Sequence, residues 1–247
     1  MNASDNCTEI VKKLKLLGSK YSIWSVFEDW LAVCAISISN SVDWNHREER
    51  EAQYLKTINK YSSDEQEILA EAFSELIIAL QKEYDINGPT DLLGKMFHAL
   101  ELHNKYQGQF FTPFNVCKLM GEISAGNIDD SVDEALSKKG YLTVYEPCVG
   151  SGGLVLGFAN SMYQKKLNYC KQIVAYCCDI DIKCVYMAYI QLSLYGIPAV
   201  VVHGNSLTVE EWSKWYTPIY LLDGWPLREK ETNFELYKRQ SKNKNNT

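Results

Sequence analysis

Apolar side chains in the first part of the chain recur at steps of three and four residues, which is the spacing of a helix with one buried face. The clearest stripe consists of Ile23, Val26, Phe27, Trp30, Leu31 and Cys34. A further helix is expected to begin at Ser63, where Ser63–Gln66 offers capping-box chemistry. After a stop at Asn87-Gly88-Pro89, Thr90 or Asp91 can cap another helix. Residues 1–105 are therefore predicted to form a helical N-terminal domain.

After about Gly108, short β-type runs alternate with helical runs. Strands are expected at residues 142–145, 173–178, 199–203 and 219–222, and helices at residues 154–163 and 182–194. Such alternation favours a parallel sheet with crossover helices. We therefore expect an α/β, Rossmann-like domain over residues 106–228 and a polar tail over residues 229–247.

Composition narrows the class of protein. Of the 247 residues, 46% are hydrophobic, so the chain can bury a substantial core and is not wholly disordered. A net charge of −6 argues against a basic protein that coats nucleic acid, although a local basic surface is still allowed.

The cysteines and the N-terminal sequence indicate a reducing compartment. The eight cysteines form no Cys-x-x-Cys pair, and the four histidines do not complete a zinc spacing, so buried free thiols and no metal site are expected. The start of the chain has no signal-peptide pattern. The most apolar stretch, Ser22–Val42, is interrupted by Glu28 and Asp29, so no membrane span is expected. These features predict a cytoplasmic protein.

The strongest local motif is the run Glu146-Pro-Cys-Val-Gly-Ser-Gly-Gly153, which lies between a predicted strand and a predicted helix. Its glycines permit a tight turn and close approach of a ligand to the backbone. The N–H groups that open the next helix can face a negatively charged group. The spacing is not that of a dinucleotide loop, and an acid precedes it. The run suits a ligand with an amine and a carboxylate, although a turn that serves only strand–helix packing has the same pattern.

Acidic residues follow the second predicted strand. Asp179 stands at the strand end, where an acid of a doubly wound fold accepts from ribose hydroxyls. Asp181 is the natural N-cap of the next helix. Two alternatives remain, namely that both acids only cap and solvate the turn, or that they bind a metal.

Two further segments carry candidate contacts. Gly204-Asn205-Ser206 follows the third predicted strand, where an asparagine can meet an adenine edge, or can simply form a polar turn. Gln109–Pro113 is an aromatic turn that leads into a helix, and its rings can flank a flat ligand or pack in the core.

In this order and spacing, the motifs resemble those of the adenine-N6 DNA methyltransferases of type I restriction-modification systems. The matching pieces are Asp91–Gly94, Gly108–Pro113, Glu146–Gly153, Asp179–Asp181 and Gly204–Leu207. The resemblance implies a Rossmann-like S-adenosylmethionine methyltransferase fold with S-adenosylmethionine as cofactor. It also implies DNA as a partner, and a second protein or a second copy of the chain.

The same resemblance assigns a cofactor role to each motif. The aromatic segment would close over the methionine moiety, the glycine loop would hold the amino-acid end, the second strand end would hold the ribose, and the third would lie near the adenine. The residues concerned are Phe110, Phe111, Thr112, Pro113, Glu146, Pro147, Cys148, Gly150, Gly152, Asp179, Ile180, Asn205 and Ser206.

One part of the family pattern is missing. The catalytic motif of the family is Asn or Asp, then Pro-Pro, then an aromatic residue, and none of the six prolines here follows Asn or Asp. Asp223 and Trp225 stand near the expected place as an acceptor and an aromatic residue. Three hypotheses follow. They are a methyltransferase completed by a partner, a binding module that transfers no methyl group, and an enzyme acting on another substrate.

Overall fold

The computed structural model describes residues 3–100, 111–126, 136 and 139–230. Helices come first along the chain. They are α1 (Ala3–Leu17), α2 (Ile23–Asn40), the short 3₁₀ helix η1 (Trp44–His46), α3 (Arg47–Ile58), α4 (Ser63–Asn87), α5 (Leu92–Ala99) and α6 (Phe114–Gly126). Strands then alternate with helices. They are β1 (Leu142–Glu146), α8 (Gly153–Gln164), α9 (Tyr169–Gln172), β2 (Ile173–Asp179), α10 (Ile182–Leu194), β3 (Ala199–Asn205), β4 (Glu210–Tyr216) and α11 (Pro218–Leu222).

The predicted helix starts hold in the first part of the chain. Helix α4 begins at Ser63 as predicted, but its capping box lies one residue earlier than the expected Ser63–Gln66, because the backbone N–H of Ser62 donates to Glu65 Oε2 at 2.8 Å. Helix α5 is capped by Asp91, which accepts from the N–H of Gly94 at 2.8 Å. These helix starts could be predicted from sequence, because a capping side chain accepts from an N–H group that has no partner within the helix.

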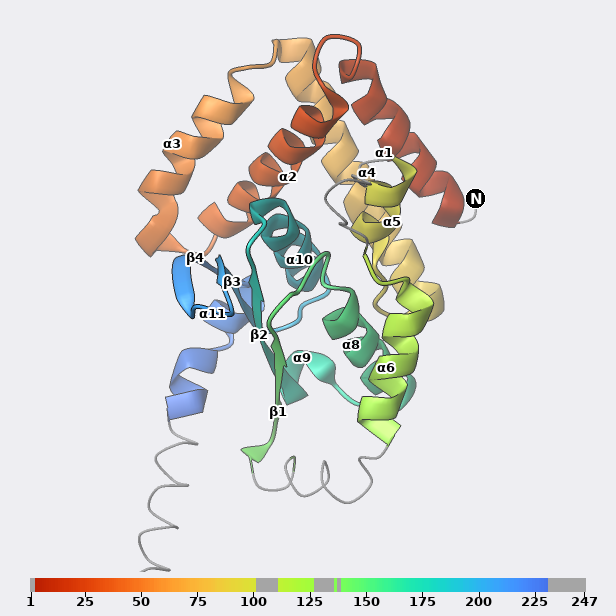
Figure 1. Cartoon of the computed structure of the whole chain (residues 1–247), viewed down its shortest axis with the longest axis vertical. Coiled ribbons are helices and arrows are strands. Elements are labelled where there is room, and N and C mark those ends of the chain that lie inside the picture. Colours follow the sequence, from red (N-terminus) through yellow and green to blue (C-terminus); the bar gives the residue numbers. More distant parts are fainter. Residues whose placement is uncertain (1–2, 101–110, 127–135, 137–138, 231–247) are drawn as a thin grey trace, which may run out of the picture.

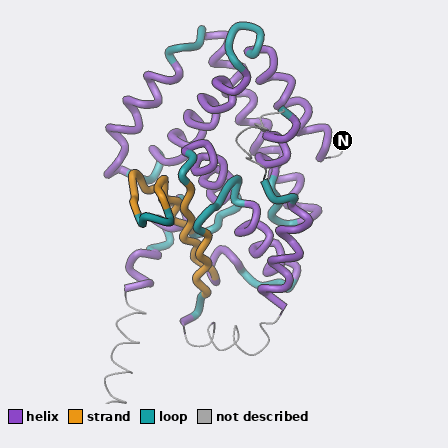
Figure 2. The backbone as a smooth tube through the Cα atoms, in the orientation of Figure 1, coloured by secondary structure: helices purple, strands orange, loops and turns teal. Residues whose placement is uncertain are grey.

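The strands form one sheet, drawn in orange in Figure 2. Their order across the sheet is β1-β2-β3-β4. β1, β2 and β3 run parallel, and β4 returns antiparallel to β3. This arrangement confirms the predicted α/β class with a partly parallel sheet. The crossover helices α8 and α10 lie on one face, against alternate residues of the strands such as Ala175, Cys177 and Val201. The other face carries Val174 and Val200, which pack with Tyr141, Tyr220 and Trp225.

The fourth predicted strand is wrong. Residues 218–222 form helix α11, because Pro218 occupies its first turn and Thr217 ends the sheet just before it. The hydroxyl of Thr217 accepts from the N–H of Ala199 at 2.9 Å and donates to the carbonyl of Ile197. The actual fourth strand is β4, whose charged residues masked the alternation of a strand. Its inward residue, Trp215, packs against tyrosines of α10.

The N-terminal helices pack directly on the sheet domain (Figure 1). Helix α2 contacts α10. Arg50 of α3 donates to the carbonyl of Lys214 in β4 at 2.6 Å and stacks over the ring of Trp215. The largest buried cluster runs from Ile10 to Trp215 without a break between the two parts. The expected division at residues 105 and 106, which lie outside the described residues, stays a proposal, and the two proposed parts share one core.

Candidate functional site

The loop between β1 and α8 is held in a conformation that its glycines make accessible. Gly150 and Gly152 have φ values of +54° and +97°, in the region that side chains disfavour. The N–H of Val149 donates to the carbonyl of Cys178 at 2.9 Å, which fixes the loop to the end of β2. A Cβ atom on Gly152 would lie 3.4 Å from the backbone of Ala188 in α10. This distance is an ordinary contact, so the positive φ of Gly152, and not a lack of space over α10, is what favours glycine here.

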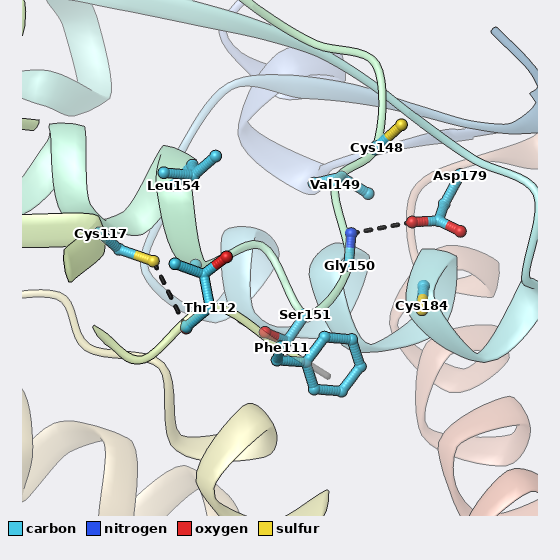
Figure 3. Close-up of a pocket in the computed structure, with 11 residues that line it drawn as sticks. Phe111, Thr112, Cys117, Cys148, Val149, Gly150, Ser151, Leu154, Asp179 and Cys184 are labelled. Atoms are coloured by element: carbon cyan, nitrogen blue, oxygen red, sulfur yellow. Dashed lines mark hydrogen bonds between the residues drawn. The ribbon is translucent and has the colours of Figure 1, made fainter. Parts of the chain in front are cut away.

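Asp179 joins the glycine loop to the second strand end (Figure 3). Its Oδ2 atom accepts from the N–H of Gly150 at 2.9 Å, and its Oδ1 atom accepts from the N–H of Asp181 at the same distance. Burial raises the pKa of the Asp179 carboxyl, and the two backbone hydrogen bonds oppose that rise. Each carboxylate oxygen keeps a second lone pair, so the group can still accept from a ligand. Asp181 caps α10 as predicted, by accepting from the N–H of Lys183.

A cavity of about 280 Å³ opens beside this loop (Figure 3). Residues from the aromatic turn, α6, the glycine loop, α8, β2 and α10 line it, namely Phe111, Thr112, Cys117, Cys148, Val149, Gly150, Ser151, Gly153, Leu154, Asp179 and Cys184. Three segments that are distant in sequence, around residues 111, 150 and 179, thus meet at one cavity. Burial raises the pKa of the Cys117 thiol to about 11, so this lining residue is a neutral thiol at pH 7.

The aromatic turn packs against the glycine loop. A Cβ atom on Gly150 would lie 3.1 Å from the ring of Phe111, so the ring lies directly over the loop. The same ring contacts Phe97 of α5, with the centroids 4.7 Å apart. Phe111 therefore serves both alternatives, as a core residue and as a wall of the cavity. Thr112 and Pro113 are exposed, and Phe110 lies outside the described residues.

The other residues that were predicted to contact the cofactor also lie at the carboxyl ends of the strands. Glu146 accepts from the N–H of Cys148 at 3.1 Å, and Cys148 and Pro147 are exposed. Ile180 is 62% exposed beside Asp179.

Asn205 ends β3, and Ser206 follows it; the side-chain oxygen of Asn205 accepts from the N–H of Leu207 at 3.0 Å. This hydrogen bond shows that Asn205 stabilises the turn after β3. It does not test the prediction that Asn205 contacts an adenine.

Sequence reasoning missed a buried polar network beneath the loop. The hydroxyl of Ser151 donates to Asp91 Oδ2 at 2.6 Å. The side-chain amide of Gln191, which is fully buried, donates to Asp91 Oδ1 and to the carbonyl of Ser151. Its oxygen accepts from the N–H groups of Leu92 and Leu93. The network joins the start of α5, the glycine loop and α10, and a glutamine inside an apolar helical run was the only signal for it.

The two candidate catalytic residues are not brought to this site. Asp223 forms an ion pair with Lys171, which precedes β2 at the amino end of the strands. Trp225 is fully buried against the ring of Tyr141, which precedes β1. The glycine loop and Asp179 lie at the carboxyl ends of β1 and β2. Asp223 and Trp225 therefore lie at the amino ends of these strands, opposite the glycine loop. Trp225 is a core residue.

A metal cluster and a membrane-spanning helix are both absent from the described residues. Among the described residues, no three histidine, cysteine or acidic side chains gather to hold a metal ion, and the cysteines are free thiols. Across the described part of the chain, each helix is too short or too polar to cross a membrane.

Fold and loop together define an α/β, Rossmann-like methyltransferase fold. A sequence model of the N-6 DNA methylase family matches residues 90–227, which is more than half of the chain, and the chain belongs to this family. No curated protein matches the chain.

Solved structures that match part of the chain include the following two. One is described as a class I S-adenosylmethionine-dependent methyltransferase from Listeria monocytogenes, with 14% identity and a TM-score of 0.47, and the match covers 83% of this chain and 54% of that one. The other is the methyltransferase subunit of a type I restriction-modification system from Streptococcus thermophilus, with 20% identity and a TM-score of 0.39, and the match covers 81% of this chain and 44% of that one. The chain spans about half the length of both.

Proposed function

We propose that the chain binds S-adenosylmethionine at the carboxyl ends of β1 and β2, as the methyltransferase-like part of a DNA adenine-N6 modification system. One observation carries this proposal. The hydrogen bond from Gly150 to Asp179 joins the loop suited to an amino acid to the acid suited to a ribose, beside a single cavity. Membership of the N-6 DNA methylase family supports both the cofactor and the DNA substrate. We also propose a cytoplasmic location, where free thiols stay reduced.

The residues present fit the chemical groups of that cofactor. The N–H groups at the start of α8 suit the carboxylate of the methionine part, and Glu146 suits its ammonium group. Asp179 suits the ribose hydroxyls, and the exposed Ile180 offers an apolar surface for the adenine. Phe111 and Thr112 line the cavity, and in this proposal they would cover the methionine part of the cofactor. When bound, the cofactor would supply an electrophilic methyl group, and the protein groups would hold and orient it.

The position of Asp223 and Trp225, at the amino ends of the strands and away from the cavity, favours a second function. Neither reaches the glycine loop, and the Asn/Asp-Pro-Pro-aromatic motif is absent from the sequence. The chain would then be a cofactor-binding or nucleic-acid-binding subunit that transfers a methyl group only with a partner, or not at all.

Two measurements test these functions. Calorimetric titration of the full chain should show binding of S-adenosylmethionine or of its demethylated product, and the absence of heat and of a thermal shift at millimolar ligand would refute the cofactor proposal. Transfer of a labelled methyl group to adenine-containing DNA by the chain alone would favour the first function over the second. Cofactor binding without transfer would favour the second.

A further inference from the structure

Two adjoining cavities lie at the amino ends of the strands, away from the glycine loop. The first, of about 310 Å³, lies between α4 and the turn that joins α10 to β3, and its lining includes Ile77, Leu80, Tyr84, Tyr169, Leu194 and Tyr195. The second, of about 590 Å³, lies beside the end of α8, and its lining includes Tyr84, Tyr163, Lys166, Leu167, Asn168 and Tyr169. The cavities share Tyr84 and Tyr169, and each has the size of a small-molecule site.

The walls of both cavities are fixed by contacts within the protein. At the end of α4, a Cβ atom on Gly88 would lie 2.6 Å from the ring of Tyr163, so that ring packs directly on the backbone. The hydroxyl groups of Tyr195 and Thr90 lie 3.3 Å apart and form a hydrogen bond. The thiol of Cys170 in α9 donates to the carbonyl of Tyr195 at 3.8 Å. These contacts join α4, α8, α9 and the α10–β3 turn, so the cavities are preformed.

Tyrosine rings dominate the inner surface of the cavities. The centroid of the Tyr84 ring lies 5.2 Å from that of Tyr163 and 6.2 Å from that of Tyr195. Burial raises the pKa of Tyr169, so its hydroxyl stays neutral and does not repel an anion. Aromatic rings prefer tilted or offset partners with centroids about 4.5–7 Å apart. A flat aromatic group would find such partners on several sides, so the cavities favour it over an aliphatic chain.

Lys166 gives the second cavity its charge. It is the only charged residue that lines either cavity, in a chain with a net charge of −6. Lys165 and Lys171 nearby already bond to acceptors of the protein, whereas the ammonium group of Lys166 has no acceptor among the described residues. In the first cavity, Gln81 is engaged by Asp85, to which it donates at 2.7 Å. An anionic group is therefore favoured at Lys166 and not at the other end.

The backbone holds Lys166 in a conformation that favours glycine. Its φ is +61°, and its N–H donates to the carbonyl of Tyr163, while the N–H of Leu167 donates to the carbonyl of Met162. This pattern ends α8, and glycine is the usual residue at such a position because side chains disfavour positive φ. The second cavity can therefore lose its cation through a substitution that relieves the backbone.

We propose that the two cavities together bind a small aromatic carboxylate, with its ring against Tyr84 and Tyr169 and its carboxylate beside Lys166. The site lies at the end of the strands opposite the cofactor cavity, and the inference does not depend on cofactor binding. Lys166 is exposed, so water screens the ion pair. The charge should thus contribute a few-fold to affinity, and the tyrosine rings the larger part.

Three indoles that differ in charge test the site on the full chain. Indole-3-acetate is an anion, indole-3-ethanol is neutral and tryptamine is a cation. In NMR titrations, millimolar indole-3-acetate should shift the amide signals of residues 166–170 and 194–196. It should bind about two- to fivefold more tightly than indole-3-ethanol, which is the scale of an exposed ion pair, and tryptamine should bind more weakly than both.

Substitutions of Lys166 test the charge. Lys166→Gln should weaken binding of indole-3-acetate about two- to fivefold and leave indole-3-ethanol unaffected, whereas Lys166→Arg should keep the preference. Lys166→Gly should lose the preference without loss of thermal stability, because glycine suits the positive φ. Lys56→Gln, which removes a charge from an exposed site on α3, is the control and should change nothing.

Neighbouring isoleucines of α4 test the apolar end. Ile77 is 43% exposed and lines the first cavity, and Ile78 is 52% exposed and lines neither. Ile77→Glu should weaken binding of indole-3-acetate about fivefold or more, because it removes an apolar contact and adds a like charge. Ile78→Glu should have little effect.

The results that overturn the proposal are distinct from those that overturn cofactor binding. Equal binding of the three indoles, equal effects of the two isoleucine variants, or no binding at millimolar concentration refutes the aromatic carboxylate site. Asp179→Ala should leave binding of indole-3-acetate unchanged. A loss in that variant would place the acid in the cofactor cavity and would also refute the site.

Discussion

The fully buried side chain of Gln191 bridges the cap of helix α5 and the glycine loop, by donating to Asp91 Oδ1 at 2.9 Å and to the carbonyl of Ser151 at 2.7 Å. Its oxygen accepts from Leu92 and Leu93. The amide of Gln191 in α10 is therefore the hydrogen-bond partner of four groups. Three of them lie at the start of α5 and one lies in the glycine loop. Buried polar groups left without partners cost about 1–3 kcal/mol each.

Gln191→Leu is expected to lower the free energy of unfolding by about 3 kcal/mol or more, because it strands several buried donors and acceptors at once. Urea denaturation measures this loss. Gln81→Leu, at an exposed site on α4, should change stability by no more than about 0.5 kcal/mol. Equal effects of the two substitutions would show that the network does not stabilise the loop.

Asp179→Ala is expected to weaken S-adenosylmethionine binding by about 1–3 kcal/mol, because it removes a charged acceptor from the cavity. Asp181→Ala is the matched control. It should cost about 1 kcal/mol of stability through loss of the cap of α10, and leave the affinity unchanged. Calorimetry with both variants separates the roles, and an unchanged affinity in Asp179→Ala would remove this residue from the site.

Cofactor affinity should fall in mild acid. Because burial raises the pKa of Asp179, this carboxyl gains its proton at a higher pH than an ordinary aspartate does, and it then loses acceptor capacity towards the ribose. Titrations at decreasing pH should show weakening that begins above the usual aspartate range. Asp179→Asn should bind weakly with a flatter profile, and an identical profile in that variant would assign the pH dependence to another group.

Arg50→Met is expected to destabilise the chain by about 3–5 kcal/mol, because it leaves the buried Asp43 without its closest cation. Burial raises the pKa of Asp43, but hydrogen bonds from His46 and Arg50 outweigh this, and the pKa lies below its ordinary value. The stabilisation is thus present above the ordinary aspartate pKa and is lost as the pH falls through the lowered one.

The exposed Arg47 offers the matched control for this ion pair. It stacks on Trp44 at the surface, so Arg47→Met should change stability by no more than about 1 kcal/mol. Thermal unfolding of both variants at neutral and acid pH checks the prediction. A loss in Arg50→Met that does not shrink in acid would argue against the ion pair as its cause.

Sequence alone predicted the features that local chemistry specifies. The caps at Asp91 and Asp181 hold because each acid lies next to the N–H groups that it satisfies. The glycine loop, and the strands before and after it, follow from residues adjacent in the chain. The family match over residues 90–227 confirms the resemblance carried by these motifs.

What sequence could not predict depends on distant partners. Gln191 and Asp91 are 100 positions apart in the sequence, and no local sequence pattern around either residue predicts their hydrogen bond. β4 was missed because its charged residues suit an edge, and only its neighbour β3 makes it a strand. Residues 218–222 have the composition of a strand, but Pro218 and the bonds of Thr217 direct them into a helix.

The unequal protection of the two sheet edges limits the size of any assembly built through them. Head-to-tail growth into a fibre needs two complementary open edges on every molecule. In the described chain, β4 is closed by charge, by a register shift and by Arg50, whereas β1 is open. With β4 closed in this way, the sheet of the described chain does not offer the two open edges that strand-by-strand growth into a filament requires.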